Sequence, residues 1–462
     1  MNRVFLTEPY LLTLKPDSEM NVCWLQSTPE PGYVEYGCSH SLHYCVSAQI
    51  YEIVGLRAPA TDQGYSDIKE ENPPMKLWQC IARIQGLRSG ERVFYRCRSG
   101  EASTHIYDFH TAPPAGEPFR FAQISDLQGF QPCEKVMREI GRKKPDFLFY
   151  SGDATFFSWR ADQWIDLDEP WQEDGARKRA FFPAMQQQNG ARLMQYCPTF
   201  FCPGNHEVDD LRVGTDKEYT LDDSHWTWSI CMQIFRPLYP EGDYSLSGKR
   251  WYSVDYSDLH ISSLHIMRWA NWGAYEKPGW RLADSIAPCS PQFRFLENDL
   301  ASTGKPFKWV IQHWHLLNKG TDVQNNLCSP ELDADGNISY PHDYGSQLMD
   351  IYSRYGVNGV SYGHSHVYER YFYHSTHYIE AAYLGCCCRE PNAALHPLGI
   401  CPVMEDNSQQ SFLIVERRPD GLFASGFYAR FPDTPFDQYQ IADADGHSVA
   451  PGNLGTGGLL TT

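Results

Sequence analysis

The stretch FAQISDLQGF at residues 121–130 decides the fold of the larger part of the chain. Its first five residues are apolar, small or uncharged, which is typical of a strand inside a sheet. The stretch then brings a carboxylate, Asp126, and two positions later the amide of Gln128. Burying a carboxylate at the tip of a core strand is unfavourable unless a cation meets it. We therefore expect Asp126 to face a cation.

The residues around this stretch predict an α/β domain. From about residue 119, short apolar stretches typical of strands alternate with longer stretches typical of helices, an alternation that indicates an α/β core. The clearest expected helices are 133–144, 176–188 and 292–303. After about residue 367 we expect a run of strands. We assign the α/β domain to residues 117–445 and a flexible Gly-rich tail to 446–462.

The first 116 residues predict an all-β domain, because apolar and aromatic residues alternate there with polar ones. GLRSGERVFYR at 86–96 resembles a turn and strand of a fibronectin type III domain, and Trp24 resembles the core tryptophan of such a β-sandwich. The Pro/Gly-rich stretch 110–118 is the expected linker between the two domains.

Composition excludes several classes of function. A net charge of −18 without a dense Lys/Arg run argues against a nucleic-acid partner. No apolar run reaches the roughly 20 residues of a membrane helix, and the N-terminus lacks the apolar core of a signal peptide. The 15 cysteines include no CxxC pair, so we expect mostly buried free thiols, a reducing compartment and a cytoplasmic protein. The oligomeric state stays open.

Side chains able to bind a metal follow nearly every predicted strand of the α/β domain. Open α/β sheets place their sites where strands end in loops, so these side chains are expected to converge. Carboxylate, amide and imidazole groups together suit Zn, Mn or Fe. Such cations would also attract an anionic substrate to an acidic protein. The set comprises Asp126, Asp153, Asn205, His206, His313, His364 and His366.

The motifs SDLQ, SGDATF, PGNHE, VIQH and GHSH resemble the five motifs of the calcineurin-like metallophosphoesterases. With the N-terminal β-sandwich, they resemble the purple acid phosphatase branch. The resemblance implies two packed mixed β-sheets flanked by helices, and two divalent metal ions (Mn, Zn or Fe) bridged by Asp153. It assigns Asp126 and His366 to the first metal. It assigns Asn205, His313 and His364 to the second.

The resemblance also implies a reaction, in which hydroxide bridging the metals attacks phosphorus of a small-molecule phosphomonoester. His206 would contact phosphate and protonate the leaving oxygen, and Glu207 would orient His206. A phosphodiester is the alternative substrate for the same site. The alternative of another class is a non-catalytic metal-binding protein that uses its β-sandwich as a contact surface.

The chain departs from the family at the first metal. Purple acid phosphatases carry a glycine where Gln128 stands and a tyrosine ligand of ferric iron where Phe156 stands, and Phe157 cannot replace that phenolate either. We therefore expect no Fe(III)-tyrosinate and a loosely held divalent first metal. Three roles remain open for Gln128: a metal ligand through its amide oxygen, a hydrogen-bond partner of metal-bound water or substrate, or a structural residue.

Further residues are candidates for contacts with the substrate. His315 lies two positions after His313 and would share its face of a continuing strand. The aromatic-rich segment 222–280 is either core or the wall of the leaving-group pocket, with His225 and Arg268 as its polar contacts.

Overall fold

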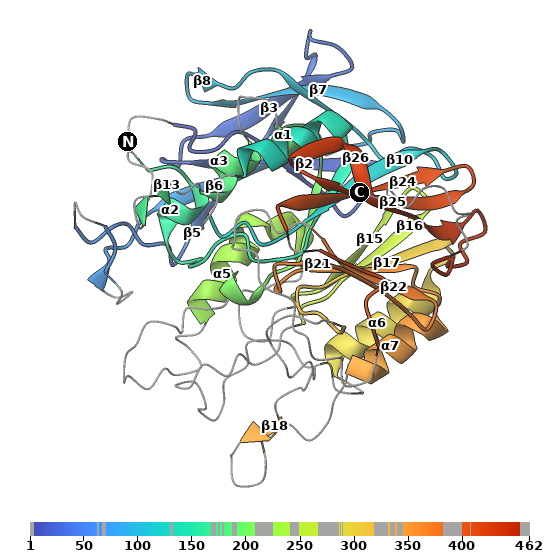
Figure 1. Ribbon diagram of the computed structural model, residues 1–462. Helices are drawn as coiled ribbons and strands as arrows, with labels where there is room; N and C mark the ends of the chain where they lie inside the picture. The colour runs from blue at the N-terminus through green and yellow to red at the C-terminus, as the bar shows by residue number, and fades with distance from the viewer. Residues whose placement is uncertain are drawn as a thin grey trace.

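A computed structural model describes most of the chain (Figure 1). The described residues are 4–61, 64–66, 71–129, 133–167, 172–173, 176–177, 180–186, 192–207, 225–240, 249–266, 286, 288, 290–317, 331–332, 338–339, 345–381, 400–406 and 408–452.

The N-terminal part is a β-sandwich of two antiparallel sheets. One has the order β1-β2-β6-β5, and the other has the order β4-β3-β7-β8, with β9 also paired to β7. Trp24 is fully buried between them, as predicted, in a core with Val34, Tyr95 and Phe109. The strands are β1 (Tyr10–Leu12), β2 (Glu19–Gln26), β3 (Gly32–Gly37), β4 (Tyr44–Ser47), β5 (Gln49–Ile53), β6 (Leu77–Gln85), β7 (Arg92–Ser99), β8 (Ala102–Ser103) and β9 (Tyr107–His110).

The α/β part contains two mixed sheets. The six-stranded sheet has the order β14-β11-β10-β24-β25-β26, and β10, β11 and β14 run parallel. The strands are β10 (Phe119–Ile124), β11 (Phe147–Tyr150), β14 (Thr199–Phe201), β24 (Ser411–Arg418), β25 (Gly421–Tyr428) and β26 (Phe431–Asp443).

The seven-stranded sheet has the order β15-β16-β17-β20-β22-β21-β23, in which β16, β17, β20 and β22 are parallel. The strands are β15 (Tyr252–Tyr256), β16 (Leu259–Ser263), β17 (Phe307–Ile311), β20 (Gly359–Tyr362), β21 (Tyr368–Tyr373), β22 (Thr376–Glu380) and β23 (Met404–Asp406). The short pairs β12 (Gln172–Glu173) with β13 (Ala176–Arg177), and β18 (Glu331–Leu332) with β19 (Ile338–Ser339), lie outside both sheets.

The two sheets pack face to face, and helices cover their outer sides (Figure 1). The Trp309 ring contacts Phe121 edge-on at 5.1 Å between ring centroids, joining the two sheets. Apolar side chains of α6 and α7 pack with Val310 and Val360 on the other face of the seven-stranded sheet. The helices are α1 (Glu134–Lys143), α2 (Ala161–Trp164), α3 (Phe181–Met185), α4 (Leu193–Tyr196), α5 (His225–Ile234), α6 (Pro291–Ser302) and α7 (Gly345–Arg354).

The fold class expected from the sequence is confirmed, and two of the three expected helices match α1 and α6 closely. The helix expected at 176–188 is shorter, because residues 176–177 form β13 and α3 begins only at Phe181. A proline at position 183, inside the first turn of α3, is tolerated because the first backbone N–H groups of a helix have no partner within it.

The β-sandwich and the six-stranded sheet share one hydrophobic core. Tyr10 and Leu25 of the sandwich belong to the same buried cluster as Phe200 of β14. The Tyr10 hydroxyl donates to the carbonyl of Ile234 at 2.9 Å, and the Tyr95 hydroxyl donates to that of Gln195 at 2.6 Å. The sandwich therefore supports the sheet that carries part of the site.

Three further expectations concern the cysteines, the tail and membrane helices. The cysteines among the described residues are all free and mostly buried, although Cys38, Cys45 and Cys401 are exposed; the cytoplasmic location stays a prediction. Residues 446–449 of the expected loose tail are held, since Asn358 donates to the Gly446 carbonyl at 2.8 Å. Among the described residues, no helix has the length and apolar character needed to span a membrane.

Candidate metal centre

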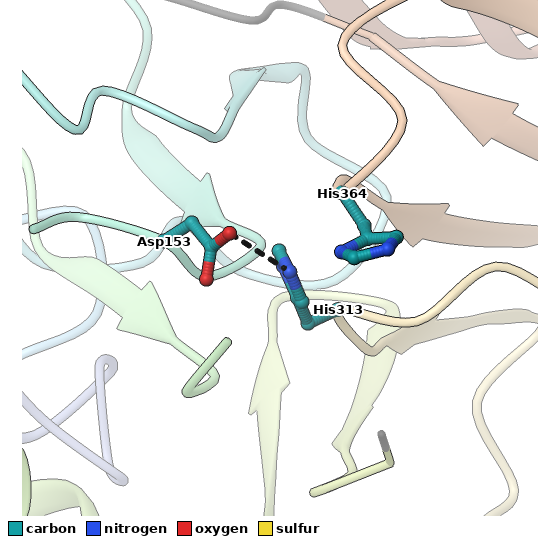
Figure 2. Close-up of side chains that lie close together, drawn as sticks. All are labelled: Asp153, His313 and His364. Carbon is teal, nitrogen blue, oxygen red and sulfur yellow. Dashed lines mark ion pairs between the residues drawn. The ribbon is translucent and has the colours of Figure 1, made fainter. Parts of the chain in front are cut away.

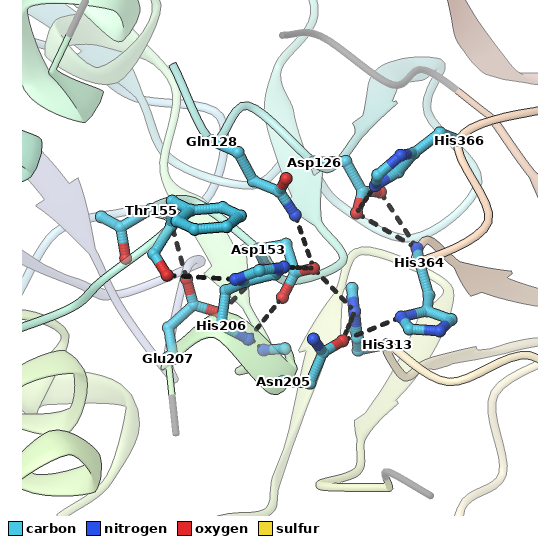
Figure 3. Close-up of polar contacts among 12 residues, drawn as sticks. Asp126, Gln128, Asp153, Thr155, Asn205, His206, Glu207, His313, His364 and His366 are labelled. Carbon is cyan, nitrogen blue, oxygen red and sulfur yellow. Dashed lines mark hydrogen bonds and ion pairs between the residues drawn. The ribbon is translucent and has the colours of Figure 1, made fainter. Parts of the chain in front are cut away.

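The predicted ligand residues follow strands at the facing ends of the two sheets. Asp126 follows β10, Asp153 follows β11, and Asn205 follows β14. His313 follows β17 and His364 follows β20 in the other sheet. Since parallel strands end at the same edge of a sheet, each sheet delivers its polar side chains to one place. Figure 3 shows the side chains from the six-stranded sheet facing those from the seven-stranded sheet.

Five of the candidate residues have a left-handed backbone. This conformation is uncommon for residues other than glycine, and each such residue costs about 1–3 kcal/mol. Strain of this kind persists only where the surrounding structure imposes it, and it concentrates at functional sites. The residues are Asp126 (φ 53°), Gln128 (φ 41°), Asp153 (φ 57°), His364 (φ 82°) and His366 (φ 60°).

The ligands assigned to the second metal lie together (Figures 2 and 3). Asn205 Oδ1 lies 3.0 Å from His313 Nε2 and 2.8 Å from His364 Nδ1. His313 Nε2 lies 3.3 Å from Asp153 Oδ2. Among the described residues, Asp153, His313 and His364 have donor atoms all within 4.8 Å of one another. The oxygen and nitrogen donors point inward, so this set fits a divalent cation of the Zn, Mn or Fe type.

The ligands assigned to the first metal form a second, adjacent group. His366 Nε2 lies 3.4 Å from Asp126 Oδ1, and both side chains are buried. The backbone N–H of His364 faces both oxygens of Asp126, at 3.2 and 3.1 Å. Gln128 belongs to this region as well, because its amide Nε2 donates to Asp153 Oδ2 at 2.9 Å. Asp153 Oδ2 therefore contacts both His313 of the first-described group and Gln128, which lies two residues after Asp126.

The buried acid and imidazole groups of the centre shift one another's pKa values. Burial disfavours the charged form of His313, but the neighbouring Asp153 raises its pKa to about 9. Burial likewise opposes ionisation of Asp153, yet His313 and His206 hold its pKa well below the usual value. The Ser151 carbonyl accepts a hydrogen bond from His313 Nδ1 at 2.6 Å, which directs Nε2 toward the carboxylate.

Close packing requires glycine beside Asp153. A Cβ atom on Gly152 would approach His313 Nδ1 to 2.5 Å, and one on Gly204 would approach the backbone N of Asp153 to 2.5 Å. Gly152 also has a φ of +87°, which side chains rarely adopt. The glycines of SGDATF and PGNHE thus let the strand ends approach closely enough to bring their ligands together.

Glu207 was expected to orient His206, but its carboxylate contacts the backbone instead. Its carboxylate accepts backbone N–H groups of Gly204 at 2.6 Å, Asp153 at 2.8 Å, Ala154 at 2.7 Å and Thr155 at 3.3 Å. Burial, followed by the charge of Asp153, raises the pKa of Glu207 to about 7. Glu207 therefore fixes the loop that carries Asp153.

His206 is positioned by another residue. Its Nδ1 lies 3.0 Å from the Phe156 carbonyl, and its ring packs on the Phe156 ring at 4.6 Å between centroids. Its Nε2 lies 3.8 Å from Asp153 Oδ2. Phe156, at the position of the family's tyrosine ligand, thus holds a ring beside the ligands without supplying a donor atom.

The remaining predicted contacts lie deeper or outside the described residues. His315 is only 1 % exposed and its Nδ1 lies 3.1 Å from the Ser365 hydroxyl, so it supports the GHSH loop from behind. The His225 side chain and all of Arg268 lie outside the described residues, as do Trp269 and Trp272 of the aromatic segment.

Sequence reasoning missed two supporting residues. Glu380 is 2 % exposed and accepts the backbone N–H of Ser365 at 2.7 Å, which fixes the loop between His364 and His366. Burial, with the charge of Asp126 next, raises the pKa of Glu380 well above its usual value. An acid at the end of the strand THYIE was the available signal. Trp314 packs on His364 at 3.9 Å between ring centroids, and no pattern in the sequence indicated it.

Comparisons with known proteins agree with this geometry. Residues 119–368 match the Metallophos family, described as calcineurin-like phosphoesterase. Acid phosphatase type 7 of Mus musculus is 24% identical over 372 residues, 78% of this chain and 69% of the relative. The Homo sapiens protein of the same name is 24% identical over 365 residues, 76% of this chain and 67% of the relative.

Solved structures show the same fold. Purple acid phosphatase PPD1 from seeds of yellow lupin (Lupinus luteus) superposes with a TM-score of 0.63 at 16% identity, covering 93% of this chain and 73% of that one. PhoD superposes with a TM-score of 0.61 at 12% identity, covering 96% of this chain and 90% of that one.

The fold, the site and the family match define the class of the protein. The chain belongs to the calcineurin-like phosphoesterase family, since the match spans more than half of its length. It is a metal-dependent phosphoesterase, as its motifs predicted, and its fold is similar to that of purple acid phosphatase PPD1. Family membership weighs against the alternative of a non-catalytic metal-binding protein.

Proposed function

We propose that this protein is a binuclear metallophosphatase that hydrolyses a small-molecule phosphomonoester. The observation that supports the proposal is the cluster of buried oxygen and nitrogen donor atoms around Asp153. One oxygen of its carboxylate lies 3.3 Å from His313 Nε2 and 2.9 Å from the Gln128 amide. The names of the mouse and human relatives, both acid phosphatases, favour a monoester over a diester.

Each group of ligands would hold one divalent ion. Asn205, His313 and His364 would hold one, Asp126 and His366 the other, and Asp153 would belong to both. Bound divalent ions supply positive charge for the phosphoryl oxygens and lower the pKa of a bound water.

The chain's own residues then determine orientation and proton transfer. His206 is anchored through Nδ1 at the Phe156 carbonyl, which leaves Nε2 to face the phosphate and to protonate the leaving oxygen. Glu207 keeps Asp153 in place by binding the backbone of its loop.

Of the three roles for Gln128, we propose that of a ligand through its amide oxygen. The amide already touches the carboxylate at the centre, through Nε2 and Asp153 Oδ2 at 2.9 Å. Rotation of the amide plane would exchange its nitrogen and oxygen, so that the oxygen would face a cation shared with Asp153. An amide is a neutral and weaker donor than imidazole, so Gln128→His is expected to tighten binding of the first metal and Gln128→Ala to loosen it. Equal metal affinities in the three proteins would refute this role.

The substrate is tested with a panel of phosphomonoesters, diesters and triesters, each assayed with Mn, Zn, Fe, Mg and Co. Metal analysis of the same samples gives the number of ions per chain. The proposal predicts that monoesters turn over fastest and that activity reaches its maximum only after the second equivalent of metal. Faster turnover of diesters would show a phosphodiesterase instead. Full activity with one equivalent would contradict the binuclear centre.

A further inference from the structure

A second group of residues able to bind metal lies in the β-sandwich, away from the ligands described above. The hairpin between β3 and β4 carries the sequence CSHSLHYC at residues 38–45. It places two thiols and two imidazoles within eight positions. All four side chains are exposed, and both thiols are free. The residues are Cys38, His40, His43 and Cys45.

Two of these residues, His40 and Cys45, lie over one face of the hairpin. Glu35 pairs with Cys45, and Gly37 pairs with Phe94 of β7, so these positions share the face opposite the buried Val34. His43 directly precedes β4, so only Tyr44 separates it from Cys45 in the sequence. The His40 ring packs on that of Phe94 at 4.4 Å between centroids, which places it over this face as well.

The loop itself has an unusual turn. The Leu42 N–H donates to the Ser39 carbonyl at 3.3 Å, and Leu42 then has a φ of +46°. A leucine in this conformation is strained, because glycine or asparagine normally occupies it. The turn returns the chain so tightly that a Cβ on Gly37 would lie 3.2 Å from the backbone N of His43. Cys38 therefore starts the loop close to the point where His43 ends it.

We propose that this hairpin binds a thiophilic divalent cation, Zn²⁺ in the first instance, through Cys38, His40, His43 and Cys45. Two thiolates and two imidazoles are a common ligand set of tetrahedral zinc sites. Binding displaces one proton from each thiol, and both imidazoles bind in the neutral form. The proposal is independent of the phosphoesterase centre, whose assigned ligands contain no sulfur.

Assembling this site would disturb the ring contact between His40 and Phe94 but few other interactions. Among the described residues, none of the four side chains makes a hydrogen bond or an ion pair, so no such contact has to be broken. Their donor atoms do not already meet within ligand distance, so binding requires rotation of exposed side chains about their own bonds. Such a site is expected to bind more weakly than a preformed one and to stiffen the edge of the sandwich.

Cobalt titration tests the proposal on the full-length protein, kept reduced with a non-chelating phosphine. Co²⁺ bound by thiolates gives a near-ultraviolet charge-transfer band, whereas Co²⁺ bound only by oxygen and nitrogen does not. We expect this band in the wild type, its disappearance after Zn²⁺ is added, and its loss in the Cys38→Ser/Cys45→Ser variant. The variant should bind one fewer equivalent of Zn²⁺ per chain and retain phosphoester hydrolysis.

Two further variants complete the test. Cys401→Ser removes an exposed cysteine outside the hairpin and should leave the band unchanged. His40→Ala/His43→Ala should weaken Co²⁺ binding without removing either thiol. Absence of the band from the wild type, or its persistence in Cys38→Ser/Cys45→Ser, would overturn the proposal.

Discussion

Replacing Glu207 with glutamine tests how the centre is held together. Each carboxylate oxygen of Glu207 accepts two backbone N–H groups: Oε2 those of Asp153 and Gly204, and Oε1 those of Ala154 and Thr155. Glutamine keeps one acceptor oxygen and turns an NH₂ group toward the other pair. Two buried N–H groups then lose their acceptor, each at a cost of about 1–3 kcal/mol. We therefore expect Glu207→Gln to lose about 2–6 kcal/mol of unfolding free energy.

The same substitution should reduce activity, because the displaced loop carries Asp153. Urea unfolding of the metal-free protein measures the loss of stability, and hydrolysis of a chromogenic monoester measures activity. Glu297→Gln is the matched control, since Glu297 forms a surface ion pair with Arg354 at 3.7 Å, and its loss should cost less than about 1 kcal/mol. If Glu207→Gln matches the wild type in both assays, Glu207 is protonated in the folded protein and our interpretation of the loop is wrong.

Three other predictions follow from the structure. Burial opposes charge on His260, but Asp255 at 2.7 Å and Asp299 at 3.0 Å raise its pKa to about 9. Its contribution to the free energy of unfolding is therefore complete below pH 6.5 and is lost as pH rises through 9. In urea unfolding, the stability of His260→Gln should decline less over this range than that of the wild type, and an equal decline would contradict this. Gly204→Ala should abolish tight metal binding in calorimetry, because the added Cβ would clash with Asp153. Gly304→Ala is the control and should bind metal normally, because no described atom lies within 4 Å of its added Cβ. Normal metal binding by both variants would contradict this prediction. Because Phe156 stands at the tyrosine position, resonance Raman spectra of the iron-loaded protein should lack tyrosinate bands, and their presence would refute that assignment.

The sequence identified the side chains that gather at the centre better than the residues that support them. Asp126 and His313 were visible because polar groups directly follow apolar strands, and strand order brings such positions together. Glu207 was expected to orient His206, yet its carboxylate accepts backbone N–H groups from its own loop and from the loop that carries Asp153. Sequence patterns identify side chains, whereas backbone donors become available only through tertiary structure.

The fold was likewise predictable only in part from the sequence. The α1 and α6 helices follow from their apolar periodicity and match the expected ranges closely. The helix expected at 176–188 is instead a short strand followed by the five-residue α3, because local periodicity does not define where tertiary contacts interrupt a helix. The hydrophobic core shared between Tyr10 of the sandwich and Phe200 of β14 was likewise not predictable from either segment alone.

The most direct test of the account is hydrolysis of a phosphomonoester by Asp153→Asn after loading with divalent metal. The asparagine keeps the shape of the side chain but cannot bridge two cations as a carboxylate does. Asp255→Asn, which changes an aspartate outside the centre, is the control. We expect Asp153→Asn to fold normally, to bind less metal and to lose at least about 100-fold in turnover. Turnover equal to that of the wild type would contradict a metal-dependent phosphoesterase centre at Asp153.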